Sequence, residues 1–285
     1  MPPIRERAKK RPDNPSMDKT LGIIAGNGDL PILIAKEALN KGYYVVVFAL
    51  EPVSEVPDDA GHEVIRLNVG KLGGLLKALK TAGVSEVVMA GKVTKELIYN
   101  GGGKITPDLK ALGLLMSLKD RKDDTIMRAV TDEIESLGIK IRNTTDFADS
   151  LLMPEGVLTK RKPSRSELKD IEFGYRMAKE IGRLDIGQTV VVKDLAVMAV
   201  EAIEGTDETI RRGGRLAREG AVVVKVSKPD QDFRFDVPVV GLNTVRSLAE
   251  VSGSVLGVEA KKALILQKEE LIEFANKRGI SIVGI

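Results

Sequence analysis

The sequence predicts an α/β protein built from two domains, and three observations support this fold class. The chain has 285 residues, which is enough for two hydrophobic cores. In its first half, short apolar segments alternate with helix-like segments, as in a parallel sheet covered by helices. Residues 153–165 then combine two prolines, a glycine and a basic run, so we expect an interdomain linker before a second α/β domain.

Residues 1–19 are basic and without periodicity, and we expect them to form a disordered tail before the first domain at 20–152. This domain begins with an apolar strand at 21–25. Pro31 favours the first position of the following helix at 32–41, because its missing N–H would have no partner there. The later elements are, in chain order, a strand at 43–50, an irregular stretch, a helix at 72–82, a strand at 86–90, helices at 107–118 and 123–137, and a strand at 139–141.

The second domain, predicted for residues 166–285, contains more strand than helix. Thr206 and Asp207 favour a helix start, because their side chains can accept hydrogen bonds from the free N–H groups of a first turn. The predicted elements are, in chain order, a helix at 167–181, paired strands at 189–193 and 196–202, a helix at 206–218, strands at 221–226 and 237–241, a helix at 244–251, a strand at 263–266, a helix at 268–277 and a strand at 281–283.

Composition restricts the chemistry that this chain can perform. It has no cysteine and one histidine, His62, which excludes thiol nucleophiles and makes multi-histidine metal centres and a histidine-activated serine improbable. Carboxylates remain, with lysines and arginines near them in sequence. That mixture suits a hard cation such as Mg²⁺ and a phosphorylated substrate.

Composition also argues against two kinds of partner. The net charge is only +3, aromatic residues make up 4% of the chain and tryptophan is absent, so we expect no nucleic-acid binding. No apolar run approaches the roughly 18 residues that span a bilayer. The absence of cysteine is compatible with a cytoplasmic location.

The turn at Gly26, Asn27 and Gly28 lies between a predicted strand and a predicted helix, as in a Rossmann-like nucleotide-binding domain. Backbone N–H groups at the start of that helix can bind a phosphate. Glu51 follows the second strand, where a ribose-binding carboxylate would lie. Pro31 replaces the third glycine of the dinucleotide motif, so the sequence favours a nucleotide or phosphate site over NAD, with a plain tight turn as the alternative.

Three other patterns favour structural roles. Tyr175 and Lys179 have the Tyr-x-x-x-Lys spacing of short-chain dehydrogenases, but the accompanying glycine pattern is absent, so we expect a surface or packing pair. The glycine-rich stretch 101–104 fails as a P-loop, because Ile98 and Ile105 replace its first glycine and its hydroxyl residue. For His62 we expect an exposed structural role.

The first of two acidic segments, at 200–207, joins the end of a strand to the start of a helix. Glu201 and Glu204 can bind a cation with Asp207, while Thr206 and the free N–H groups can bind a phosphate. Ordinary helix capping by Thr206 and Asp207 is the alternative.

The second acidic segment, at 228–238, alternates charged residues. If its backbone is extended, Asp232, Arg234 and Asp236 point to one side, next to Lys228, and form a phosphate and metal site. A solvated edge strand is the alternative. Both acidic segments lie at strand ends. Taken together, they therefore favour a phosphate and metal site over helix capping and a solvated edge strand.

Together these segments resemble the UDP-2,3-diacylglucosamine pyrophosphatases of the LpxI type. The resemblance covers about residues 20–285 and does not include the tail. It rests on five segments, which are residues 22–31, 90–94, 180–188, 200–212 and 228–238.

The resemblance implies hydrolysis of UDP-2,3-diacylglucosamine to UMP and lipid X in lipid A biosynthesis, by attack of water on the β-phosphate with the help of Mg²⁺ (or Mn²⁺). It also implies two α/β domains with a ligand cleft between them, a homodimer, and a cytoplasmic enzyme that contacts the inner face of the cytoplasmic membrane. The family's essential aspartate, in its Arg-x-Asp-x-Pro pattern, falls on Asp236.

Combining this resemblance with the residues themselves, we expect Asp236 to be catalytic. The expected metal ligands are Asp236, Asp232, Glu204 and Asp207. The expected substrate-binding residues are Gly26, Asn27, Gly28, Lys92, Gln188, Thr206, Arg212, Lys228, Gln231 and Arg234. A non-catalytic regulator that binds a nucleotide sugar or lipid is the main alternative, followed by a nicotinamide-dependent oxidoreductase.

Overall fold

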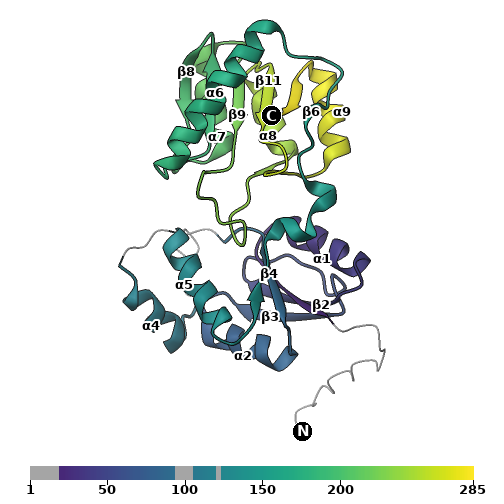
Figure 1. The fold of residues 1–285 in the computed structure, drawn as a ribbon, viewed down its shortest axis with the longest axis vertical. Coiled ribbons are helices and arrows are strands. Elements are labelled where there is room, and N and C mark those ends of the chain that lie inside the picture. Colours follow the sequence, from purple (N-terminus) through teal and green to yellow (C-terminus); the bar gives the residue numbers. More distant parts are fainter. Residues whose placement is uncertain (1–18, 94–104, 120–122) are drawn as a thin grey trace. The chain divides into compact units, whose positions relative to one another are not determined.

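The computed structural model describes residues 19–93, 105–119 and 123–285, and the chain divides after Ile141 into two compact units (Figure 1). Residues 1–18 of the expected tail and the glycine-rich stretch 101–104 lie outside the described residues. The segment 153–165, expected to link two domains, lies within the second unit.

In the described part of the first unit, five parallel strands form one sheet in the order β3-β2-β1-β4-β5. This order is that of the first five strands of a Rossmann-like sheet, and with the helices that follow β1, β3 and β4 it confirms the predicted α/β class. The strands are β1 (Thr20–Ala25), β2 (Tyr44–Glu51), β3 (Glu63–Asn68), β4 (Glu86–Ala90) and β5 (Lys140–Ile141), and the helices are α1 (Leu30–Asn40), α2 (Leu72–Ala82), α4 (Leu109–Ser117) and α5 (Asp123–Glu135).

Strand β3 was predicted to be irregular, because it mixes polar and apolar residues and is mostly half-buried. It pairs with β2 in register from Val46 opposite Glu63 to Glu51 opposite Asn68. The central strands β1 and β2 are almost wholly buried, which explains why their apolar runs were recognisable in the sequence.

The second unit is built on a mixed six-stranded sheet in the order β6-β13-β11-β9-β7-β8. Strands β9, β11 and β13 are parallel, β6 and β7 pair antiparallel with β13 and β9, and β8 pairs antiparallel with β7. The elements are η1 (Thr144–Phe147), η2 (Asp149–Leu151), β6 (Gly156–Val157), α6 (Arg165–Arg183), β7 (Thr189–Lys193), β8 (Ala196–Val200), α7 (Thr206–Ala217), β9 (Val222–Lys225), β10 (Val239–Val240), α8 (Leu242–Glu250), β11 (Val255–Val258), β12 (Leu264–Ile265), α9 (Lys268–Arg278) and β13 (Ser281–Gly284).

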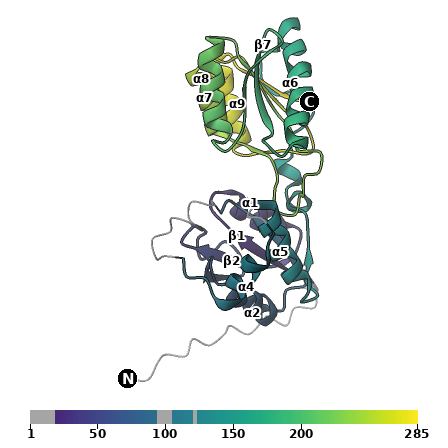
Figure 2. The same ribbon diagram turned by 90° about the vertical axis from the view of Figure 1, so that its left-hand side faces the viewer.

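Helices cover both faces of this sheet, with α6 on one side and α7, α8 and α9 on the other (Figure 2). Alternate residues of each strand supply the two cores. Val191 and Val223 face the three-helix side, whereas Val190 and Val224 face α6. The sequence missed β11, and it assigned strands to 237–241 and 263–266, which form a separate two-stranded sheet as β10 and β12.

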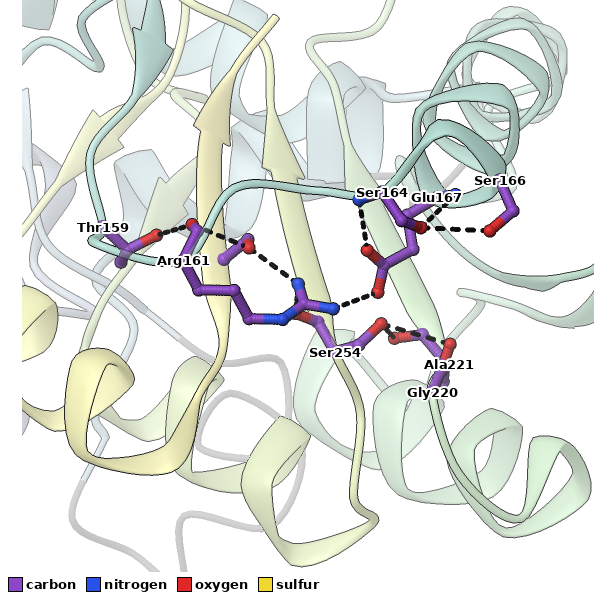
Figure 3. Close-up of polar contacts among 9 residues, drawn as sticks. Thr159, Arg161, Ser164, Ser166, Glu167, Gly220, Ala221 and Ser254 are labelled. Atoms are coloured by element: carbon purple, nitrogen blue, oxygen red, sulfur yellow. Dashed lines mark hydrogen bonds and ion pairs between the residues drawn. The ribbon is translucent and has the colours of Figure 1, made fainter.

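The segment 153–165 is fastened to the second unit by backbone and side-chain contacts. Met153 is fully buried in the core, and β6 pairs with β13. The Arg161 guanidinium donates to Glu167 Oε1 at 2.6 Å (Figure 3). It also donates to Ser281 Oγ at 2.7 Å. Ser164 and Glu167 complete a capping box at the start of α6. The basic run resembled a solvated linker, but its arginine holds this segment to the sheet.

We expect Arg161→Met to destabilise the second unit by about 2 kcal/mol, since it leaves the Glu167 carboxylate, only 12% exposed, without its cation. Burial alone would raise the pKa of Glu167, but hydrogen bonds from Arg161 and Ser164 lower it from 4.5 to about 2. The stabilisation is therefore complete above pH 4.5 and is lost as the pH falls towards 2. Urea unfolding at pH 7 and pH 3 measures both effects.

Lys261→Met is the matched control, because the ion pair of Lys261 with Glu155 is exposed. We expect a change within about 0.5 kcal/mol for this variant. Equal losses in the two variants would contradict the role assigned to Arg161.

Candidate functional site

In the first unit, the predicted turn residues meet Lys92 at the carboxyl ends of β1 and β4. The backbones of Asn27 and Lys92 exchange two hydrogen bonds of 2.9 Å, and Gly26 N–H donates to Ala90 O at 2.8 Å. The strand order reverses between β1 and β4, which is where ligands bind in open parallel sheets. The structure thus gathers Gly26, Asn27, Gly28 and Lys92 at one place.

This meeting point requires glycine at two positions. A Cβ on Gly26 would lie 2.7 Å from Lys92 O, and a Cβ on Gly91 would lie 2.7 Å from Asn27 O. Gly91 also has a φ of +87°, a conformation that L side chains rarely adopt. The two chain segments therefore approach each other at backbone contact, with no room for side chains between them.

His62 is exposed and has a structural role, as expected. Its ring stacks on Tyr44 with a centroid distance of 4.4 Å, and its Nδ1 accepts a hydrogen bond from Val45 N–H at 3.1 Å. The ring is thus held against the edge of the sheet.

In the second unit, polar residues from four strands gather at one edge of the sheet, outside the carboxyl ends of β9 and β11. Gln188 precedes β7, Glu201 follows β8, Ser227 follows β9 and Glu259 follows β11. Hydrogen bonds of 3.0 Å from Val226 N–H to Gln188 O and from Glu259 N–H to Lys225 O connect these ends. Ligand sites of α/β proteins commonly form at such an edge.

A buried lysine joins the two acidic segments. Lys225, at the end of β9, is 6% exposed. Its Nζ donates to Thr206 Oγ1 at 2.9 Å and to Val239 O at 3.0 Å. Thr206 in turn donates to Glu201 Oε1 at 2.7 Å. The start of α7 and the end of the 228–238 loop are therefore neighbours, as the functional interpretation of the two segments requires.

Within the 228–238 loop, Asp236 faces Lys228 and Gln231. Lys228 Nζ lies 4.0 Å from Asp236 Oδ2 and 2.7 Å from Asp185 Oδ1. The Gln231 amide donates to the Asp236 carboxylate, and its Oε1 accepts from Lys228 N–H at 2.8 Å. The loop thus places one carboxylate beside one ammonium group at the sheet edge.

The expectation of an extended 228–238 segment was wrong. Asp236 N–H donates to Asp232 O at 2.9 Å, so the backbone turns here. Arg234 instead bonds the Asp232 carboxylate, with Nη2 at 2.8 Å from Oδ2. The alternation of charges reflects local pairing within a turn and not one face of a strand.

The four expected metal ligands do not form a cluster. Glu204 pairs with Arg212, which also donates to Val200 O at 2.8 Å, and Asp232 pairs with Arg234. The pKa of Glu204 is lowered by hydrogen bonds from the backbone N–H of Glu204 itself and from the Arg212 side chain. Asp207 lies in the first turn of α7. Across residues 19–93, 105–119 and 123–285, no group of three or more acidic or histidine side chains is arranged to hold a metal ion.

Several residues of this edge were not predicted as site residues, among them Glu259, Lys225 and Asp185. Glu259 was missed because the strand before it was missed, and Lys225 because it lay inside a predicted strand. Asp185 has a left-handed φ of +56°, which places it beside Lys228. Asp185 lies in the LpxI-like segment 180–188, and this position was the signal in the sequence that could have identified it.

Comparisons with known proteins decide the family. Models of the LpxI N-terminal and C-terminal domains match residues 20–151 and 154–283. UDP-2,3-diacylglucosamine pyrophosphatase LpxI of Caulobacter vibrioides is 32% identical over 94% of this chain and 98% of its own length. The chain belongs to the LpxI family. All five LpxI-like segments contribute to the two sheet edges described above or to their immediate neighbours.

Other matches to this LpxI-family chain are weaker. The bifunctional purine biosynthesis protein PurH of Bradyrhizobium diazoefficiens is 28% identical over 45% of the chain and 24% of its own length. The N5-carboxyaminoimidazole ribonucleotide synthetase of Thermotoga maritima covers 65% of the chain and 42% of its own, at 18% identity and a TM-score of 0.23. Neither adds to the family assignment.

Proposed function

We propose that this protein hydrolyses the pyrophosphate bond of UDP-2,3-diacylglucosamine, releasing UMP and 2,3-diacylglucosamine 1-phosphate. The observation that carries the proposal is the placement of Asp236 beside Lys228 at the sheet edge of an LpxI-family chain. The relative from Caulobacter vibrioides has the same activity in its name. The proposed role lies in lipid A biosynthesis.

Charge supports this reaction. The Lys228 ammonium lies between two carboxylates, and a pyrophosphate oxygen can approach it from solvent, since its side chain is 20% exposed. Arg234 is oriented by Asp232 and would add a second positive charge near the phosphates. These cations stabilise negative charge that develops on the phosphoryl oxygens. In the first unit, the turn at 26–28 would bind the nucleotide through backbone N–H groups.

We further propose that Mg²⁺ (or Mn²⁺) takes part, held by Asp236 together with oxygens of the substrate. The Asp236 side chain is 38% exposed, so a cation can reach it. Mg²⁺ commonly binds one or two carboxylates and completes its shell with phosphate and water, which does not require a cluster of protein ligands. When bound, it would lower the pKa of a water molecule and polarise the phosphoryl group. Asp236 would also orient the attacking water.

A UMP-release assay tests the proposal directly. We expect UMP from UDP-2,3-diacylglucosamine in the presence of Mg²⁺, loss of the signal in EDTA, and recovery when Mg²⁺ or Mn²⁺ is restored in excess. Full activity in EDTA would contradict the proposed need for a metal ion, but the proposal that the protein is a hydrolase would stand. Tight binding of the lipid without UMP would instead favour a non-catalytic regulator.

The substrate carries two acyl chains, so we also propose transient contact with a membrane surface. We further propose that the protein is a homodimer. None of the helices in the described ranges has the length and apolar character needed to cross a bilayer. Sedimentation with lipid vesicles tests the contact, and light scattering tests the dimer.

A further inference from the structure

The Tyr-x-x-x-Lys pair of α6 belongs to a buried polar network at the sheet edge. Lys179 Nζ lies 2.6 Å and 2.8 Å from the two carboxylate oxygens of Glu259. Tyr175 Oη donates to the same carboxylate at 3.3 Å, and Lys262 Nζ lies 3.1 Å from it. The Glu259 side chain is only 6% exposed. The spacing that resembles a dehydrogenase motif thus serves to hold one carboxylate.

The network bonds Ser227, the residue immediately before the 228–238 loop that carries Asp236. Glu259 Oε2 accepts from Ser227 N–H at 2.7 Å and from Ser227 Oγ at 2.8 Å, and Lys179 Nζ donates to Ser227 O at 2.9 Å. Ser227 therefore has its N–H, its hydroxyl and its carbonyl bound by two side chains. Lys228 is the next residue.

The other end of the loop has a similar anchor. Lys225 Nζ donates to Val239 O at 3.0 Å, immediately beyond Pro238. Sheet pairing in β9 ends at Lys225. The end of the loop is also held by a strand, since Val239 lies opposite Leu264 of β12 and Leu264 N–H donates to Pro238 O at 2.8 Å. Lys179 and Glu259 thus hold the residue before the segment that contains Asp236, and Lys225 together with β12 holds its end.

We propose that Lys179 and Glu259 are positioning residues, which hold Ser227 and thereby fix Lys228 and Asp236 in the geometry of the reaction. This inference rests on the function proposed above. A buried ion pair alone contributes little to stability when compared with apolar residues, but one that bonds a loop backbone restricts where that loop can lie. Small displacements of groups that act on a substrate are costly, since misplacement by about 1 Å can reduce a rate about 100-fold.

Glu259→Gln tests this role, because it keeps the size of the side chain and removes its charge. We expect kcat for UMP release to fall about 10-fold to 100-fold, with KM changed less than about threefold. In the substrate-free protein, we expect amide hydrogen exchange to accelerate in residues 227–238 and to stay unchanged in β7 and β11. Glu155→Gln, which alters an exposed carboxylate of the same unit, is the matched control and should match the wild type.

Two variants of Lys179 test the same role if the Glu259→Gln protein does not fold. Lys179→Met should reproduce the loss in kcat and the faster exchange of residues 227–238. Lys179→Arg, which keeps the positive charge, should show a smaller change in both. Wild-type exchange in residues 227–238, or faster exchange with wild-type kcat, would overturn the proposal. If the wild-type chain releases no UMP, the proposed function fails, while the exchange measurement still decides whether the network fixes the loop.

Discussion

Asp236→Ala is expected to lower kcat for UMP release by about 100-fold or more while the protein stays folded. The Asp236 side chain is 38% exposed, and its carboxylate faces Lys228 and the Gln231 amide on a loop, outside both hydrophobic cores of the second unit. Its removal therefore takes away a charge next to the reacting phosphoryl group and little packing. Substrate binding should persist, since Lys228 and Arg234 remain.

Two variants sharpen this test. Asp236→Asn keeps the shape of the side chain and removes its charge, so it should lose nearly as much activity as the alanine variant. Asp230→Ala removes an exposed carboxylate of the same loop and should retain kcat within about twofold, as for most surface changes away from a site. Wild-type kcat in a folded Asp236→Ala protein would overturn the assignment of the site.

Gly91→Ala is expected to destabilise the first unit by about 3 kcal/mol. Roughly 1–2 kcal/mol comes from forcing a Cβ into a conformation with φ of +87°, and the rest from its approach to within 2.7 Å of Asn27 O. Because the contact is with backbone, relief requires movement of the turn at 26–28, so nucleotide binding should weaken as well. Hydrogen exchange of β1 and β4 in the intact chain measures the loss.

Gly138→Ala separates the two causes. Gly138 has a similar φ of +77°, but a Cβ there would meet nothing within 4 Å. We expect this variant to cost about 1 kcal/mol. Equal losses for both variants would show that the close approach of the two chain segments contributes nothing.

The sequence alone was sufficient for features that depend on local pattern. The apolar runs of β1, β2 and β9 are buried on both faces, and the amphipathic helices α6 and α7 follow recognisable starts. The turn at 26–28 was located for the same reason. Motif chemistry and family resemblance also singled out Asp236, Lys228 and Gln231, which are neighbours in the structure.

Features that depend on tertiary contacts were missed. Strand β11 is short and contains Gly257, so nothing local marks it, and Glu259 was missed with it. The alternation of Asp232 and Arg234 predicted a strand, whereas the backbone turns and the two side chains pair. Arg161 lies in a basic run typical of a linker, and only its contacts with Glu167 and Ser281 reveal its place at the sheet.

The pairing of β6 and β11 with β13 bears on the order of events during synthesis. The first unit has all of its described strands once residue 141 is made, and it can fold while the ribosome continues. In the second unit, β11 remains an open edge and β6 has no partner until residues 281–284 emerge. A nascent chain paused shortly before β13 would expose an apolar strand edge, the kind of surface on which chains aggregate.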